Sequence, residues 1–172
     1  MRGSGKTAIG KTLADHLDFE FVDVDKTLEK SEGVKISEIV KKHDWEHFRD
    51  LESKYTTAAA QQTQVVISTG GGVILREKNI DNLKKNGVIV FIHAPIEHLA
   101  RRVAKNDNRP SLTGKTPHEE LEAVWNERKE LYKKYADVEV FFDFETKNKK
   151  TDLIRKSKMV LKAIQNSWQI RR

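Results

Sequence analysis

Gly3-Ser4-Gly5-Lys6-Thr7 stands near the start of the chain and is followed by apolar residues at helical spacing, Ile9, Leu13 and Leu17. A loop that binds the phosphates of a nucleoside triphosphate and its Mg²⁺ needs backbone N–H groups, a lysine ammonium and a hydroxyl. A glycine-rich turn that opens a helix supplies all three, and the positive end of the helix dipole adds to them. The apolar run Phe19–Val24 then predicts a strand, which completes the order of turn, helix and strand that such a loop requires.

The complete phosphate-loop pattern also has a glycine five positions before Gly5, preceded by a buried strand. That position falls before Met1. We therefore expect a parallel sheet whose first strand is truncated, and weak stability unless a rearranged pairing or a strand from another copy fills the place. A bare Gly-Lys-Thr also recurs by chance in surface turns, so the prediction depends on the helix and the strand that follow it.

Composition narrows the class of protein. The chain has 172 residues, a net charge of +6 and no cysteine, which is typical of one domain and excludes disulfides and thiolate metal sites. Its basic residues are spread out, without interleaved aromatic residues, which argues against nucleic acid and suits a small anionic substrate with ATP. No apolar run reaches the length of a membrane span and no secretory signal is visible, so we expect a cytoplasmic protein without a membrane partner. We also expect a monomer, with strand exchange between copies as an alternative.

Apolar runs alternate with helical stretches, which predicts βαβ units and a three-layer α/β sandwich with a parallel sheet. The predicted strands read as buried on both faces: Phe19–Val24, Val65–Ser68, Val88–Ile92 and Val138–Phe142. The predicted helices are Ile36–Lys42, Phe48–Ala60, Ile96–Ala104, Glu119–Tyr135 and a tail after Thr151. The polar segment Asn106–Thr116 is expected to be a flexible lid of the single domain 1–172.

Two carboxylates, Asp23 and Asp25, stand at the end of the first predicted strand. Residues two apart in a strand point the same way, so both should emerge at the edge where open α/β sheets bind ligands. Close carboxylates repel unless a cation or a donor separates them, which suggests Mg²⁺ near Asp23 and a substrate hydroxyl near Asp25. The alternative is that Asp25 caps the helix that follows.

Three consecutive glycines, Gly70-Gly71-Gly72, come directly after a predicted buried strand. They let the backbone approach a ligand closely, although a glycine run can also be a flexible turn. Taken alone, Arg49 and Arg128 are best interpreted as solvated helical residues. Arg109 lies in the lid segment, where a cation suits the charge that develops on a transferred phosphoryl group.

Together these segments resemble the shikimate kinase family over nearly the whole chain. The residues that carry the resemblance are Gly3-Ser4-Gly5-Lys6-Thr7, Phe21-Val22-Asp23-Val24-Asp25, Phe48-Arg49-Asp50-Leu51-Glu52, Ser68-Thr69-Gly70-Gly71-Gly72, Asn108-Arg109-Pro110, and Asn126-Glu127-Arg128 with Leu131-Tyr132. The resemblance implies ATP-dependent phosphorylation of the 3-hydroxyl of shikimate, in aromatic amino-acid biosynthesis, on a P-loop fold like that of nucleoside monophosphate kinases. A P-loop kinase for gluconate or nucleoside monophosphates and a catalytically impaired binding module remain as alternatives.

The resemblance also implies roles for individual residues. The implied catalytic residues are Lys6, Asp25 and Arg109. The implied nucleotide-binding residues are Gly3, Ser4, Gly5, Lys6, Thr7, Ala8, Arg102, Arg109 and Asn148. Thr7 and Asp23 match the ligands of Mg²⁺, with Asp23 acting through water. The implied shikimate-binding residues are Asp25, Arg49, Gly70, Gly71, Gly72 and Arg128, with the two arginines on the substrate carboxylate.

Overall fold

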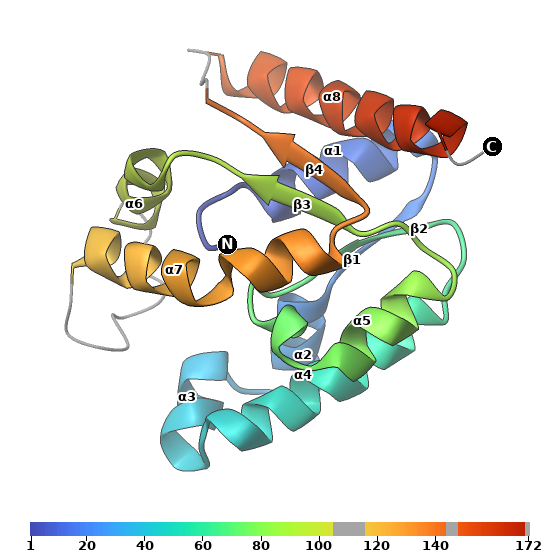
Figure 1. The fold of residues 1–172 in the computed structure, drawn as a ribbon. Coiled ribbons are helices and arrows are strands. Elements are labelled where there is room, and N and C mark those ends of the chain that lie inside the picture. Colours follow the sequence, from blue (N-terminus) through green and yellow to red (C-terminus); the bar gives the residue numbers. More distant parts are fainter. Residues whose placement is uncertain (105–115, 144–147, 171–172) are drawn as a thin grey trace.

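The structure, a computed structural model, describes residues 1–104, 116–143 and 148–170 (Figure 1). Its elements are α1 (Lys6–Leu17), β1 (Glu20–Asp23), α2 (Val24–Glu32), α3 (Ile36–Lys42), α4 (Trp45–Ala60), β2 (Val65–Ser68), the 3₁₀ turn η1 (Val73–Leu75), α5 (Glu77–Lys84), β3 (Val90–His93), α6 (Ile96–Ala104), α7 (Pro117–Tyr135), β4 (Val138–Phe141) and α8 (Lys149–Ile170). Among these helices, none is long and apolar enough to cross a membrane.

Most of the predicted elements are present, and three of them have the predicted bounds, namely α3, α6 and β2. Helices α2 and α5 were not predicted. Each has fewer than ten residues and buries only two of them, Val24 and Leu28 in α2 and Asn79 and Ile80 in α5. Two buried residues are too few to show a helical period in the sequence. Both helices pack against α4, and this packing stabilises them.

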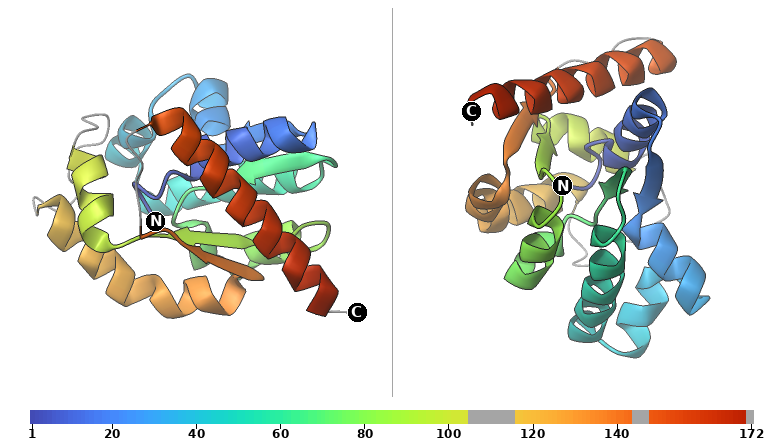
Figure 2. Two further views of the ribbon diagram at one scale, coloured as in Figure 1. Left: turned by 90° about the horizontal axis from the view of Figure 1, so that it is seen from above. Right: turned by 90° about the vertical axis from the view of Figure 1, so that its right-hand side faces the viewer.

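The four strands form two separate parallel pairs instead of one continuous sheet. Strand β1 pairs with β2, from Glu20 opposite Val65 to Asp23 opposite Ser68. Strand β3 pairs with β4, and within the described residues no ladder joins the two pairs. The N-terminal residue lies between the pairs (Figure 2). The predicted single parallel sheet is therefore interrupted between the two pairs.

Helices cover the strands on two sides and complete the three layers (Figures 1 and 2). On one side, α1 and α8 pack on the strands through a core that includes Ile9, Ile92 and Val160. On the other side, the core of η1, α5, α6 and α7 includes Phe91 and Leu99. A third cluster joins α2, α3 and α4 through the buried side chains of Leu28, Ile36, Ile39 and Phe48.

Strand β4 corrects the prediction that every strand is buried on both faces. Val138 and Val140 are buried, whereas Glu139 and Phe141 on the opposite face are exposed. In the described part of the chain, α8 packs on the valine face and β3 is the one strand that pairs with β4. The side chains along it therefore alternate between the core and solvent, as on a one-sided sheet.

Candidate active site

The glycine-rich turn adopts the backbone that a phosphate loop needs. Gly3 and Gly5 have φ angles of +74° and +85°, a region that glycine occupies without strain. A Cβ on Gly3 would lie 2.8 Å from the carbonyl oxygen of Leu99, so the turn also needs a glycine for space. Helix α1 begins at Lys6, directly after the turn, so its positive end faces the turn; within the described residues no side chain caps it. Arg102 approaches the same turn and donates a hydrogen bond to the Gly3 carbonyl at 3.0 Å.

The positive charges of Lys6 and Arg128 both act on the buried Met1 residue beside this turn. The ammonium of Lys6 donates to the carbonyl oxygen of Met1 at 2.9 Å, and the Ser4 hydroxyl donates to the same oxygen at 3.0 Å. Burial lowers the pKa of the Met1 α-amino group well below its usual range, and the charges of Lys6 and Arg128 lower it further. The two cations that disfavour a positive charge at Met1 would favour an anion bound there.

The hydroxyl of Thr7 lies at the end of the β1–β2 pair. It donates to Asp23 Oδ2 at 2.8 Å and lies 3.5 Å from the hydroxyl of Ser68, which is paired with Asp23 in the strand register. Mg²⁺ in phosphoryl-transfer sites prefers such oxygen ligands, taking one or two carboxylates and completing its shell with phosphate and water. Thr7 and Asp23 therefore fit the metal role expected of them, and Ser68 adds an oxygen that the sequence analysis had not assigned to the metal.

The two aspartates do not lie as predicted. Strand β1 ends at Asp23, and Asp25 belongs to the first turn of α2, so strand alternation does not relate them. Asp23, and not Asp25, is the helix cap: its Oδ1 accepts from the Lys26 amide at 3.2 Å. The Asp25 carboxylate instead faces Gly70, where an added Cβ would lie 3.0 Å from its Oδ1. The pair thus divides between two sides of the site.

On the Asp25 side, helix α4 contributes an ion pair. Arg49 donates to Glu52 Oε2 at 2.6 Å, and Glu52 is 1% exposed. Its other oxygen, Oε1, has no hydrogen-bond partner within the described residues and would lie 2.7 Å from a Cβ on Gly70. Burial raises the pKa of Glu52; the charge of Arg49 and its hydrogen bond oppose this, and the Asp25 charge adds to the increase. A Cβ on Gly72 would overlap the Arg49 guanidinium, so the glycines allow α4 and the turn to approach this closely.

Aromatic rings also support Arg49. Its guanidinium carbon lies 5.4 Å from the centre of the Trp45 ring and 5.0 Å from that of Phe48. These contacts, together with Glu52, hold the charge in one place on the helix. The Arg49 side chain is only 14% exposed. The interpretation of Arg49, taken alone, as a solvated helical residue is therefore wrong.

Helix α7 brings Arg128 to the same place. The hydroxyl of Tyr132, one turn further along α7, donates to the Gly71 carbonyl at 2.6 Å. Burial raises the pKa of Tyr132, whereas the charge of Arg128 and its hydrogen bond lower it. The charge of Arg49 also acts on Tyr132, and that of Arg128 acts on Glu52. Arg49 lies against Gly72, and Arg128 is hydrogen-bonded to Tyr132, which contacts Gly71. The two arginines therefore flank one site beside the glycine run, and Arg128 is only 18% exposed.

Sequence reasoning gave no role to Glu52 or Tyr132, although a signal for each was present. Glu52 stands three residues after Arg49 and Tyr132 four after Arg128, the spacings at which helical side chains are neighbours. Of the other expected residues, Ala8 is exposed in the first turn of α1, and Asn148 accepts from the Thr151 amide at 3.1 Å where α8 begins. Arg109 and most of the lid segment 106–116 lie outside the described residues.

The comparisons with known proteins agree on one family. A family described as "Shikimate kinase" matches residues 2–163. The shikimate kinase of Caldanaerobacter subterraneus subsp. tengcongensis is 41% identical over 135 residues, which make up 78% of this chain and 78% of the relative. The shikimate kinase of Thermodesulfovibrio yellowstonii is 41% identical over 132 residues, covering 77% of this chain and 76% of that one.

Solved structures show the same fold. The shikimate kinase from Acinetobacter baumannii in complex with shikimate has a TM-score of 0.82 at 29% identity, covering 95% of this chain and 88% of that chain. The shikimate kinase from Aquifex aeolicus has a TM-score of 0.77 at 31% identity, and the match covers 95% of this chain and 91% of that chain. With the phosphate loop, the divided aspartates and the two arginines in place, the chain belongs to the shikimate kinase family.

Proposed function

We propose that this protein transfers the γ-phosphoryl group of ATP to the 3-hydroxyl of shikimate, giving shikimate 3-phosphate and ADP. The observation that carries the proposal is the position of the two arginines at the glycine run: Arg49 lies against Gly72 and pairs with the buried Glu52, and Arg128 is hydrogen-bonded to Tyr132, which contacts Gly71. Two arginines on separate helices are suited to the carboxylate of a small acid, because each offers paired donors in a fixed fork. One solved relative is described as a complex with shikimate, a ligand of this class.

The two sides of the site divide the work between donor and acceptor. On the acceptor side, Arg49 and Arg128 bind the carboxylate, and Asp25 with the backbone of Gly70 and Gly71 orients the hydroxyl. On the donor side, Lys6 and the turn from Gly3 to Thr7, with Ala8, bind the phosphates. Arg102, which already contacts this turn, and Asn148, at the start of α8, bind the nucleoside end of ATP.

Transfer depends on positioning and on neutralising charge. The ammonium of Lys6 exchanges the Met1 carbonyl for oxygens of the phosphates. As the hydroxyl oxygen bonds to phosphorus and the bond to ADP breaks, Asp25 accepts the hydroxyl proton. Thr7 and Asp23 would hold Mg²⁺, which when bound neutralises phosphate charge. Arg109 would add a further cation. Monomeric state and cytoplasmic location stay predictions.

The direct test measures ADP release with shikimate, gluconate or a nucleoside monophosphate as acceptor, and with no acceptor. We expect turnover with shikimate to exceed every other condition by at least about tenfold, and phosphorus NMR to place the phosphate on the 3-hydroxyl. Preferred turnover of gluconate or a nucleoside monophosphate would replace the assigned substrate. ATP binding without turnover of any acceptor would identify an impaired binding module.

A further inference from the structure

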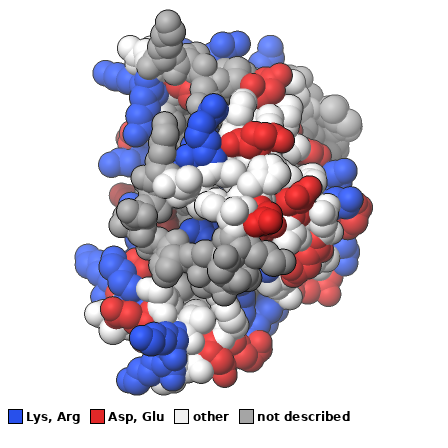
Figure 3. All heavy atoms as spheres, turned by 90° about the vertical axis from the view of Figure 1, so that its left-hand side faces the viewer, with Lys and Arg blue, Asp and Glu red and all other residues white. Residues whose placement is uncertain are grey.

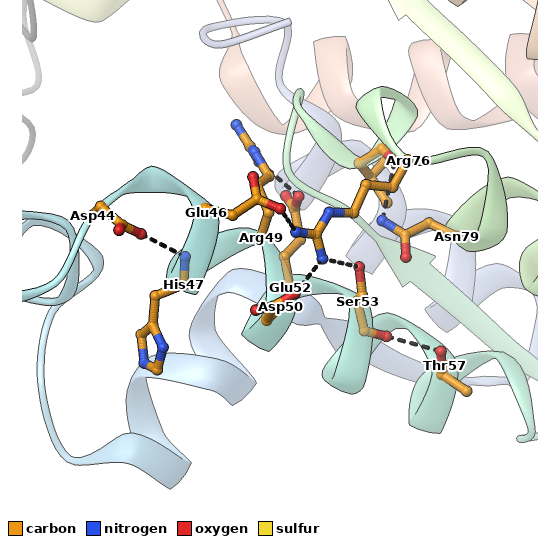
Figure 4. A network of polar contacts seen from close by, with 11 residues as sticks. Asp44, Glu46, His47, Arg49, Asp50, Glu52, Ser53, Thr57, Arg76 and Asn79 are labelled. Carbon is orange, nitrogen blue, oxygen red and sulfur yellow. Dashed lines mark hydrogen bonds and ion pairs between the residues drawn. The ribbon is translucent and has the colours of Figure 1, made fainter.

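Arg76 occupies a position between the glycine run and helix α4. It follows η1 directly and precedes α5, and its guanidinium reaches back across to α4 (Figure 4). There it donates to Asp50 Oδ1 at 2.6 Å, pairs with the carboxylate of Glu46, and lies 3.5 Å from the Ser53 hydroxyl. One guanidinium thus holds two carboxylates of the helix that carries Arg49.

Those two carboxylates form an unfavourable pattern without a cation. Glu46 and Asp50 are four residues apart on α4, where like charges repel. Glu46 is also three residues before Arg49, the spacing at which a helical glutamate pairs with an arginine. Asp50 is adjacent to Arg49 in sequence, and neighbouring residues on a helix do not face each other. Glu46 is therefore the carboxylate in this pair that can compete for the donors of Arg49.

We propose that Arg76 is a positioning residue for substrate binding, because it holds the Glu46 carboxylate away from Arg49. With Glu46 engaged, the Arg49 guanidinium keeps its pairing with Glu52 and offers its remaining donors to the carboxylate of an acid substrate. Loss of Arg76 frees Glu46 to pair with Arg49 and adds uncompensated negative charge beside the anion site. This role rests on the proposed function of Arg49.

The test compares the KM for shikimate of wild type with that of Arg76→Ala. Glu46 and Asp50 are 78% and 68% exposed, so the effect is that of an exposed pair, an increase in KM of about twofold to fivefold. The KM for ATP and kcat should not change. Arg76→Lys keeps the charge but loses the planar guanidinium that spans both carboxylates. Its KM for shikimate should therefore lie between those of wild type and Arg76→Ala. The matched control is Lys84→Gln. It removes a cation of α5 whose ion-pair partner, Asp137, does not belong to α4.

Two double variants separate the proposed role from its rivals. Arg76→Ala/Glu46→Gln should return the KM for shikimate to near the wild-type value, whereas Arg76→Ala/Asp50→Asn should not. A clamp that only fixed the position of α4 would be restored by neither change. If Arg76 acted only through its positive charge, both second changes would restore the KM for shikimate equally. Either of these two results overturns the proposal, as does an unchanged KM in Arg76→Ala.

A readout independent of turnover keeps this inference distinct from the proposed function. The Nε–H resonance of Arg49, assigned by its loss in Arg49→Lys, should shift in Arg76→Ala and return in the Glu46→Gln double variant. If wild type fails to phosphorylate shikimate while this resonance shifts and returns, the substrate is wrong and the role of Arg76 stands. If the resonance does not move, the role of Arg76 is wrong whatever the substrate.

Discussion

The proposed phosphate-binding half of the site is built around one stretch of chain, Gly3–Thr7, whereas the proposed acid-binding half draws on α4, α7 and the turn after β2. In the first half, the shape comes from two glycines with positive φ and from the start of a helix. In the second half, the shape comes from contacts between elements, such as Tyr132 on Gly71 and the Arg49 guanidinium against Gly72.

Asp23 and Asp25 show the same contrast within three residues. Asp23 ends a strand and binds Thr7, so it belongs to the phosphate half. Asp25 begins a helix and faces Gly70, so it belongs to the acid half. The boundary between the halves therefore runs through one strand-to-helix junction. On the face in Figure 3, the coloured basic and acidic side chains are interspersed.

A strand placed ahead of Met1 should have the largest effect and should act mainly on the phosphate half. Strands β2 and β3 belong to separate pairs, and an apolar strand ending in glycine would pair with both and lead directly into the phosphate turn. Burying even three large side chains stabilises by several kcal/mol, which corresponds to a rise in Tm on the order of 10–20 °C. Calorimetry measures the Tm, and ATP titration should show tighter binding.

The control for that experiment is an extension of equal length made of glycine and serine. It cannot bury apolar surface, so it should leave the Tm and ATP affinity unchanged. If the apolar extension behaves like the polar one, the interruption between the two strand pairs has no bearing on stability or on the phosphate loop.

Asp25→Asn tests whether the two aspartates have different roles. Removing a group that orients the hydroxyl and accepts its proton should lower kcat by about 10²–10⁴-fold, and the KM for ATP should remain near the wild-type value. Asp15→Asn, which neutralises an exposed carboxylate on α1, serves as the control in the same steady-state assay. Near-full turnover in Asp25→Asn would remove this residue from the chemistry.

Arg49→Lys and Arg128→Lys test the acid half. Lysine keeps the charge but loses the paired donors, and a charged hydrogen bond contributes roughly 1.5–3 kcal/mol. Each change should raise the KM for shikimate by about 10–100-fold and affect the KM for ATP far less. Arg101→Lys, on the exposed side of α6, is the control. A larger effect on ATP than on shikimate would place the arginines in the wrong half.

Glu52→Gln should have the smallest effect, on the pH dependence of stability. The pKa of Glu52 is raised above its usual 4.5 by burial, so the folded state holds this proton more tightly than the unfolded state. Its contribution to the free energy of unfolding is therefore full below pH 4.5 and falls as the pH rises through the folded pKa. Urea unfolding over this range should show a negative slope that Glu52→Gln reduces. Glu127→Gln, at an exposed carboxylate, should keep the slope; equal slopes in all three proteins would contradict this assignment.

Much of the fold was predictable because its signals are local. The runs that form β2, α3 and α6 are bounded by changes in apolar period, and their limits agree with the structure. The short helices α2 and α5 were missed, because two buried residues are too few to show a period. The exposed face of β4 was missed for a different reason: its sequence is apolar on that face at Phe141, but among the described elements α8 packs on the opposite, valine face.

The sequence by itself determined the phosphate turn and the parallel α/β class, since glycine conformation, helix start and strand period act between residues a few positions apart. Only the tertiary structure decided which carboxylate serves which half, and which residues surround the arginines. Arg76 contacts Asp50 and Tyr132 contacts Gly71 between elements that are distant in the chain, and such contacts leave no spacing to read. Burial then determines the electrostatics, because it raises the pKa of Glu52 in a way that no neighbour in sequence would cause.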